Sequence, residues 1–410
     1  MLSDRAALRL HLQANPLALF PARKTNIPAR GSPVRSSAWL KWLRYGVASF
    51  AGAVALAVIG GALFAWSGLY DVAASAGHLA ITRDFLQYVM KQSVAFHAPQ
   101  LKAPPLEDPK LILRGAAHYH TGCAPCHGAR GTQASPIELR ATPPPPPLYD
   151  VERTFSPDEL HWIVKHGIKM TAMPAWPSQQ RDDEVWAIVA FLEKLASLDQ
   201  NAYEELATGS EPKIARAEQK PGLSALAEPP PEVGLVCARC HGIDGRGREH
   251  AFPNIAGLNG AYIRDQLDAF SDGTRPSGFM QPVAANLTDE EKQKLSAYFA
   301  RLPRGEVEES VVAAADLKLG KSIAQFGISG KVPGCLSCHS ANPADLSPDI
   351  PQLIGQSYEY LVQQLLLFRS GARAQTRNDE TMARFSKELT ETEIKAVSAY
   401  FASLSSQKAT

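Results

Sequence analysis

Every cysteine of this chain lies in one of three Cys-x-x-Cys-His motifs. The motifs are Cys123-Ala-Pro-Cys126-His127, Cys237-Ala-Arg-Cys240-His241 and Cys335-Leu-Ser-Cys338-His339. Two thiols at this spacing can each form a thioether with a vinyl group of one porphyrin, and the adjacent histidine supplies an axial nitrogen to the iron. The sequence therefore predicts three covalently bound haems c, with no cysteine left for a disulfide or a nucleophile.

Two other uses of a Cys-x-x-Cys pair fit the sequence less well. A zinc ribbon groups two such pairs in one site, whereas here a whole domain length separates each motif from the next. A redox dithiol does not need a histidine directly after its second cysteine. We therefore expect haem at all three motifs.

Charged residues divide the chain into a basic and an acidic part. Residues 1–44 carry a net charge of +7, and the rest of the chain carries −6. Between Tyr45 and Tyr70 there is no charged residue. The acidic part lacks the basic footprint that nucleic-acid binding needs, so we expect no nucleic-acid partner.

The uncharged segment has the length and the flanks of a transmembrane helix. Its core, from Val47 to Trp66, matches the ~20 apolar residues that cross a bilayer. Aromatic residues lie at both ends of the segment, as in an aromatic belt: Trp39, Trp42, Tyr45, Trp66 and Tyr70. The alternative is a cleaved signal peptide with Ala74-Ser75-Ala76 near the cleavage site, but the apolar stretch exceeds the usual h-region of ~7–15 residues.

Basic residues on the N-terminal side of this segment place that side in the cytoplasm. Haem c is attached outside the bacterial cytoplasmic membrane, which agrees with this orientation. We therefore expect a single-pass protein of the bacterial inner membrane, with a cytoplasmic N-terminus and periplasmic haem domains.

The second and third motifs lie in two copies of one domain. Cys237 and Cys335 are 98 residues apart, and an offset of 102 relates Met280 to Met382. The offset of 98 also relates residues further along each copy: Pro253 to Pro351, Gly257 to Gly355, Tyr262 to Tyr360, Gln266 to Gln364 and Phe270 to Phe368. Each copy ends in a capping box followed by apolar residues at helical spacing, which predicts a final helix. The boxes are Thr288 with Glu291 and Thr390 with Glu393.

These patterns give a domain map. We expect a cytoplasmic basic tail over residues 1–44, an anchor over 45–70, a juxtamembrane helix and linker over 71–109, haem domains over 110–200, 232–304 and 305–410, and a linker over 201–231.

The ligand opposite the histidine decides what each haem does. Methionine in that position raises the potential, whereas an open position permits ligand binding or peroxide chemistry. Met280 and Met382 each lie 18 residues before a tyrosine of the final helix. In the first domain Met173 lies 18 residues before Phe191. We therefore expect His127/Met173, His241/Met280 and His339/Met382 as the three pairs of iron ligands.

Two alternatives stay open in the first domain. Met170 lies 21 residues before Phe191 and competes with Met173. Histidine is also a common axial ligand, and four histidines lie in this region: His118, His120, His161 and His166.

With these residues in place, the chain resembles class I cytochromes c over residues 110–405. In that family a proline carbonyl accepts a hydrogen bond from the proximal histidine, and Pro253 and Pro351 each lie 12 residues after their histidine. Residues 232–405 resemble the dihaem cytochrome c4 family. The first domain has no proline at that place but has the run Pro143–Pro147, so which carbonyl supports His127 stays open.

The resemblance implies an all-α fold, with one N-terminal transmembrane helix followed by three small class I cytochrome c domains. The layout is also similar to the cytochrome c subunits of periplasmic dehydrogenases. We expect a trihaem protein without catalytic residues that carries single electrons between periplasmic donor and acceptor proteins and the respiratory chain. A dedicated subunit of a periplasmic dehydrogenase or a haem-copper oxidase is the alternative; a haem peroxidase is less favoured, because it would need a haem without a strong sixth ligand.

Overall fold

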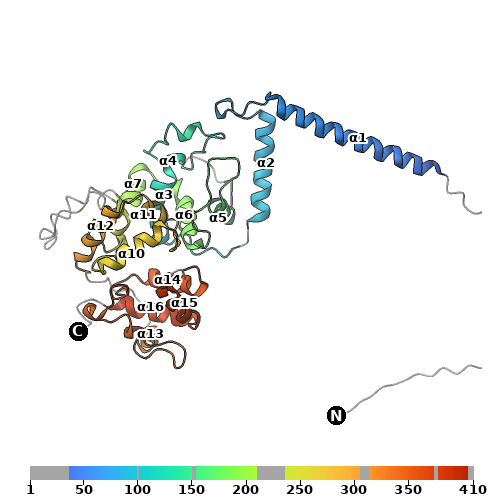
Figure 1. The fold of residues 1–410 in the computed structure, drawn as a ribbon. Coiled ribbons are helices and arrows are strands. Elements are labelled where there is room, and N and C mark those ends of the chain that lie inside the picture. Colours follow the sequence, from blue (N-terminus) through green and yellow to red (C-terminus); the bar gives the residue numbers. More distant parts are fainter. Residues whose placement is uncertain are drawn as a thin grey trace, which may run out of the picture. The chain divides into compact units, whose positions relative to one another are not determined.

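The computed structural model describes residues 37–98, 101–149, 154–209, 236–304, 314–373 and 377–404. Most of the expected basic tail and most of the linker expected over 201–231 lie outside these residues. Regular structure in the described residues is helical apart from two isolated β-bridges (Figure 1). The chain forms two units divided after Val72.

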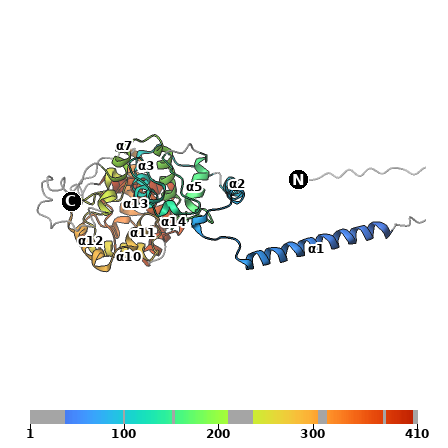
Figure 2. The same ribbon diagram turned by 90° about the horizontal axis from the view of Figure 1, so that it is seen from above.

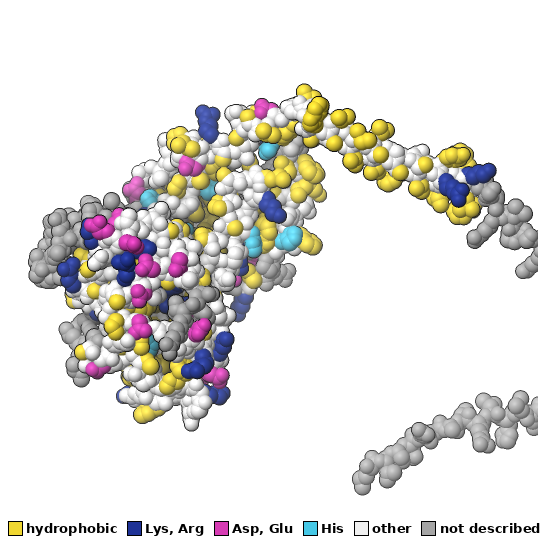
Figure 3. Space-filling model, in the orientation of Figure 1, with side chains coloured by type: hydrophobic (Ala, Val, Ile, Leu, Met, Phe, Trp, Pro, Cys, Tyr) yellow, Lys and Arg dark blue, Asp and Glu magenta, His cyan; other side chains and the backbone are white. Residues whose placement is uncertain are grey.

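The first unit contains helix α1 (Ser37–Ser67), which includes most of the uncharged segment. Its stretch Trp39–Ser67 has a mean hydropathy of 2.2, and none of its most apolar part is buried. Hydrophobic side chains cover α1 along its length, with Lys and Arg side chains near its N-terminal end (Figure 3). By length and composition α1 is able to cross a membrane, a property that signal sequences share.

The first haem domain of the second unit is built around the crossing of α3 (Pro109–Gly122) and α6 (Asp182–Leu195). A Cβ at Gly115 would lie 2.0 Å from the carbonyl oxygen of Ala187, so only glycine allows this approach. The other helices of this part of the chain are α2 (Ala80–His97), α4 (Ala124–His127), α5 (Pro157–His166) and α7 (Gln200–Thr208).

Helix α7 belongs to the core of the first domain rather than to a linker. Tyr203 of α7 is fully buried with Tyr119 and Phe191. We expected the linker to start at residue 201, so the packed domain extends further than the sequence pattern indicated. The signal that could have found it is the N-cap Asp199, whose side chain accepts a hydrogen bond from the backbone of Ala202.

The second and third domains repeat one arrangement of helices. The second contains α9 (Ala238–His241), α10 (Gly260–Ser271), α11 (Met280–Ala285) and α12 (Asp289–Arg301). The third contains α13 (Ala314–Phe326), α14 (Tyr358–Ser370), α15 (Arg377–Lys387) and α16 (Glu391–Ser403). Helices α10 and α12 lie side by side in both ribbon views (Figures 1 and 2).

Both capping boxes predicted from the sequence are present at the starts of α12 and α16. Each N-cap of this kind stabilises its helix by about 1 kcal/mol. Gly320 of α13 approaches Ala396 of α16 as closely as Gly115 approaches Ala187, since its Cβ would also lie 2.0 Å from a carbonyl oxygen. The first and third domains therefore share one helix crossing.

Candidate haem sites

Each Cys-x-x-Cys-His motif lies in a single tight turn. In the first and third domains the backbone N–H of the histidine donates to the carbonyl of the first cysteine, at 2.9 Å for His127 and 2.8 Å for His339. Burial raises the pKa of the Cys123 thiol to about 12 and that of Cys335 to about 11. These two thiols are therefore protonated at neutral pH.

All three motif histidines bond to a proline carbonyl. In the first domain Nδ1 of His127 lies 2.8 Å from the oxygen of Pro146. The corresponding distances are 3.0 Å from His241 to Pro253 and 2.8 Å from His339 to Pro351. Such a bond fixes the ring orientation and leaves Nε2 available to a metal.

Burial lowers the pKa of all three imidazoles, although the proline carbonyl acts in the opposite direction. The neutral imidazole is the form that ligates a metal.

Pro146 answers the question that the sequence left open for the first domain. The run Pro143–Pro147 brings this carbonyl to His127 from 19 residues along the chain, whereas the other two prolines lie 12 residues after their histidines. A run without backbone donors keeps its carbonyls free to accept from a side chain. Sequence spacing alone did not reveal this, because the loop between motif and proline is longer than in the repeats.

A cavity of about 650 Å³ joins the second and third motifs. The cysteines, the histidine and the methionine of both domains line it: Cys237, Cys240, His241, Met280, Cys335, Cys338, His339 and Met382. The remaining wall is largely apolar and includes Leu295, Phe299 and Phe401. Apolar walls with a few placed polar groups are typical of cofactor sites of ~300–1,000 Å³. These residues fit a porphyrin held by thioethers beside each histidine.

In the first domain the two candidate methionines differ in their surroundings. Met170 is 78% exposed and has a φ of 59°. Met173 is half-buried, and its carbonyl oxygen accepts a hydrogen bond of 3.3 Å from the N–H of Ile168.

The four competing histidines of the first domain have other contacts. His118 stacks on Phe279 with ring centroids 4.7 Å apart, and Nδ1 of His120 lies 3.0 Å from the Tyr203 hydroxyl. The other two contact an acid or a ring: His161 lies beside Asp182, and His166 beside Trp162.

Where the second and third domains meet, two arginines form a nearly symmetrical network. Arg275 and Arg373 each lie 4.5 Å above a phenylalanine ring of their own domain. The side-chain oxygen of Gln266 accepts from both arginines, and so does that of Gln364. The sequence showed these glutamines only as repeated residues, and the constant offset of 98 was the available signal.

Family models match all three haem domains. A model described as cytochrome c matches residues 234–303 and 320–405, and one described as cytochrome c oxidase, cbb3-type, subunit III, matches residues 110–192. The thiosulfate dehydrogenase electron acceptor of Stutzerimonas stutzeri is 34% identical over 174 residues, 42% of this chain and 80% of the relative. Cytochrome c4 of Pseudomonas aeruginosa is 31% identical over 173 residues, 41% of this chain and 84% of the relative.

Among solved structures, cytochrome c4 of Acidithiobacillus ferrooxidans is 33% identical and aligns over 41% of this chain and 98% of its own, with a TM-score of 0.37. The family models and the sequence relatives show that the chain belongs to the cytochrome c family. More particularly, it is a multihaem cytochrome c electron carrier similar to cytochrome c4 and to the thiosulfate dehydrogenase electron acceptor. The family, the all-α fold and the c4-like pair of domains expected from the sequence are thereby confirmed.

Proposed function

We propose that this chain is a membrane-anchored trihaem cytochrome c that passes single electrons between periplasmic redox proteins and the respiratory chain. The observation that carries the proposal is the repetition of one arrangement three times: a Cys-x-x-Cys-His turn whose histidine bonds to a proline carbonyl. When bound, each haem supplies a one-electron iron couple. The chain contributes thioether attachment, oriented imidazoles and apolar burial.

The six proposed iron ligands are His127, Met173, His241, Met280, His339 and Met382. Met280 and Met382 line the same cavity as their histidines, which supports ligation in the second and third domains. The exposure of Met170 supports Met173 in the first domain. A strong sixth ligand on each iron disfavours peroxidase chemistry.

We propose that α1 is the anchor and that the haem domains lie in the periplasm. The length of α1, its apolar composition and the basic residues before it support this orientation. We also propose three haem domains close to the expected boundaries, with the first extended to include α7.

The electron donor is proposed to be a periplasmic dehydrogenase, because two curated relatives are electron acceptors of thiosulfate dehydrogenase. A permanent oxidase subunit is the second candidate, favoured by the match of residues 110–192 to a cbb3-type oxidase subunit. The acidic part of the chain favours a basic docking partner whose association weakens as salt is added.

Purification from solubilised membranes tests the proposal. Co-purification of a dehydrogenase or an oxidase in constant ratio would favour the subunit. A chain that is released from membranes by detergent alone, without such a partner, supports the anchored carrier. A chain found in the soluble periplasmic fraction would contradict the anchor.

A further inference from the structure

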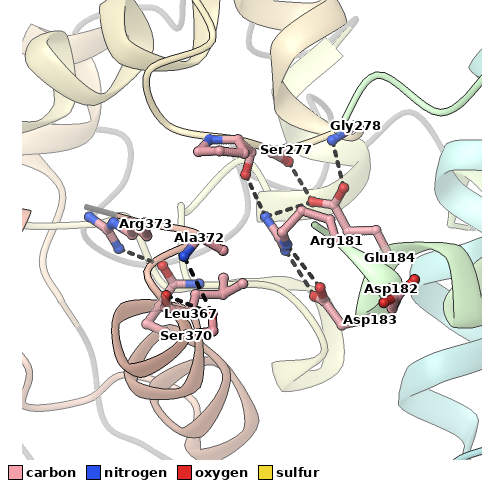
Figure 4. Close-up of polar contacts among 12 residues, drawn as sticks. Arg181, Asp182, Asp183, Glu184, Ser277, Gly278, Leu367, Ser370, Ala372 and Arg373 are labelled. Atoms are coloured by element: carbon pink, nitrogen blue, oxygen red, sulfur yellow. Dashed lines mark hydrogen bonds and ion pairs between the residues drawn. The ribbon is translucent and has the colours of Figure 1, made fainter. Parts of the chain in front are cut away.

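The loop that carries Met280 is held by a carboxylate of the first domain. Glu184 lies in the first turn of α6 and is 2% exposed. Its Oε1 accepts from the Ser277 hydroxyl at 2.6 Å, and its Oε2 accepts from the Gly278 N–H at 2.6 Å (Figure 4). The Ser277 oxygen in turn accepts from the Met280 N–H at 3.0 Å. Two hydrogen bonds therefore connect Glu184 to the backbone of Met280.

Other groups of the first domain fix the same loop and the same carboxylate. Arg181 lies 2.9 Å from Oε1 of Glu184 and donates to the Pro276 carbonyl at 2.9 Å. The Trp176 indole N–H donates to Oε2 of Glu184 at 3.2 Å. A Cβ at Gly278 would lie 2.2 Å from the Trp176 ring, so glycine is needed for this close packing. A buried carboxylate with several donors has little freedom to move.

Aromatic contacts extend this attachment to the residue next to Met280. Phe279 lies 4.7 Å from the His118 ring and 5.7 Å from the Trp176 ring, measured between centroids. Both partners belong to the first domain. The loop of residues 276–280 is thus enclosed by side chains that its own domain does not supply.

The third domain has a carboxylate of its own in the equivalent loop. The offset of 102 that relates Met280 to Met382 places Asp379 where the second domain has Ser277. Asp379 is buried and pairs with Arg373 of its own domain at 3.3 Å. The second domain has no carboxylate at this position of its methionine loop, and Glu184 of the first domain supplies one.

We propose that Glu184 is a positioning residue for Met280, so that docking of the first domain sets the coordination and the potential of the second haem. This inference rests on the proposed ligation by Met280. Glu184 acts through Ser277 and the loop backbone, and it does not touch the iron. Loss of this attachment leaves Met280 on a less constrained loop, and weaker methionine ligation lowers a haem potential.

Glu184→Ala in the haem-loaded full chain is the first test. Ferric iron with a methionine ligand has a weak methionine–iron charge-transfer band, and we expect the variant to lose the share of this band that one haem contributes. The same variant should lower one of three potentials in a redox titration. Glu290→Ala is the matched control, because it removes an exposed glutamate of the second domain. It should leave the band and all three potentials unchanged.

Rescue separates positioning from a general loss of structure. Glu184→Ala combined with Ser277→Asp gives the second domain a carboxylate of its own, as Asp379 does in the third, and should restore the band. Ser277→Ala is a milder variant that keeps the pair of Glu184 with Arg181, and it should shift the same haem. Haem content and helicity of each variant confirm folding.

Either of two results would overturn the inference: an unchanged band and unchanged potentials in Glu184→Ala, or a loss that Ser277→Asp does not restore. Met280→Leu tests the underlying ligand separately. If Met280→Leu keeps the full band, the proposed ligation itself fails. If Met280→Leu loses one haem's share while Glu184→Ala loses none, only the positioning role fails.

Discussion

The network between the second and third domains predicts that one amide oxygen contributes several kilocalories per mole to stability. In Gln364→Leu, the buried guanidinium groups of Arg275 and Arg373 each lose one hydrogen-bond acceptor. A hydrogen bond to a charged group is worth ~1.5–3 kcal/mol, and burial of the leucine side chain offsets ~1 kcal/mol. Because two such bonds are lost, the free energy of unfolding should fall by about 2–5 kcal/mol.

The near symmetry of the network adds a stricter requirement. Gln266 accepts from the same two arginines, so Gln266→Leu should have an effect within ~1 kcal/mol of that of Gln364→Leu. Gln293→Leu on the exposed face of α12 is the control and should change stability by no more than ~0.5 kcal/mol. The assay is denaturant unfolding of the haem-loaded chain, with the shift in midpoint compared at constant slope. If Gln364→Leu unfolds at the same midpoint as the control, the reasoning is wrong.

Three further predictions concern the first domain. Gly115→Ala should destabilise the first domain by ~1–3 kcal/mol in a thermal unfolding assay, because the new Cβ would overlap α6. Gly260→Ala is the control and should be tolerated, because its Cβ would have no neighbour closer than 3.6 Å. Met173→Leu should remove one haem's share of the methionine–iron band and Met170→Leu should not; the reverse result would exchange the two assignments. Burial, followed by the charge of Arg239, lowers the pKa of His118 to about 4 from 6.5. Between these pH values the unfolded chain binds a proton at His118 that the folded chain does not bind. Stability, measured by denaturant midpoints, should therefore fall as the pH drops from about 6.5 to 4, and His118→Phe should make this fall less steep.

Local chemistry explains why much of the structure was predictable from the sequence. The three motifs need only five consecutive residues each, and the capping boxes at Thr288 and Thr390 need only four. The repeat offsets identified two similar domains without any knowledge of their packing. Such features depend on short stretches of chain, so the sequence contains the information directly.

Features that depend on distant parts of the chain were not predictable in the same way. The carbonyl of Pro146 lies 19 residues after His127, whereas the repeats have a proline 12 residues after the histidine, so their spacing did not predict this contact. Helix α7 packs into the core through Tyr203, although its sequence resembles a polar connection. Glu184 meets Ser277 only because two domains dock, and no periodicity in either segment indicates that contact.

The number of electrons that one chain accepts tests the central claim most directly. Coulometric reduction of the purified, fully oxidised protein should take up three electrons per polypeptide, in three one-electron steps. An uptake of two or fewer, from chains whose motifs are intact, would contradict a carrier with three haems.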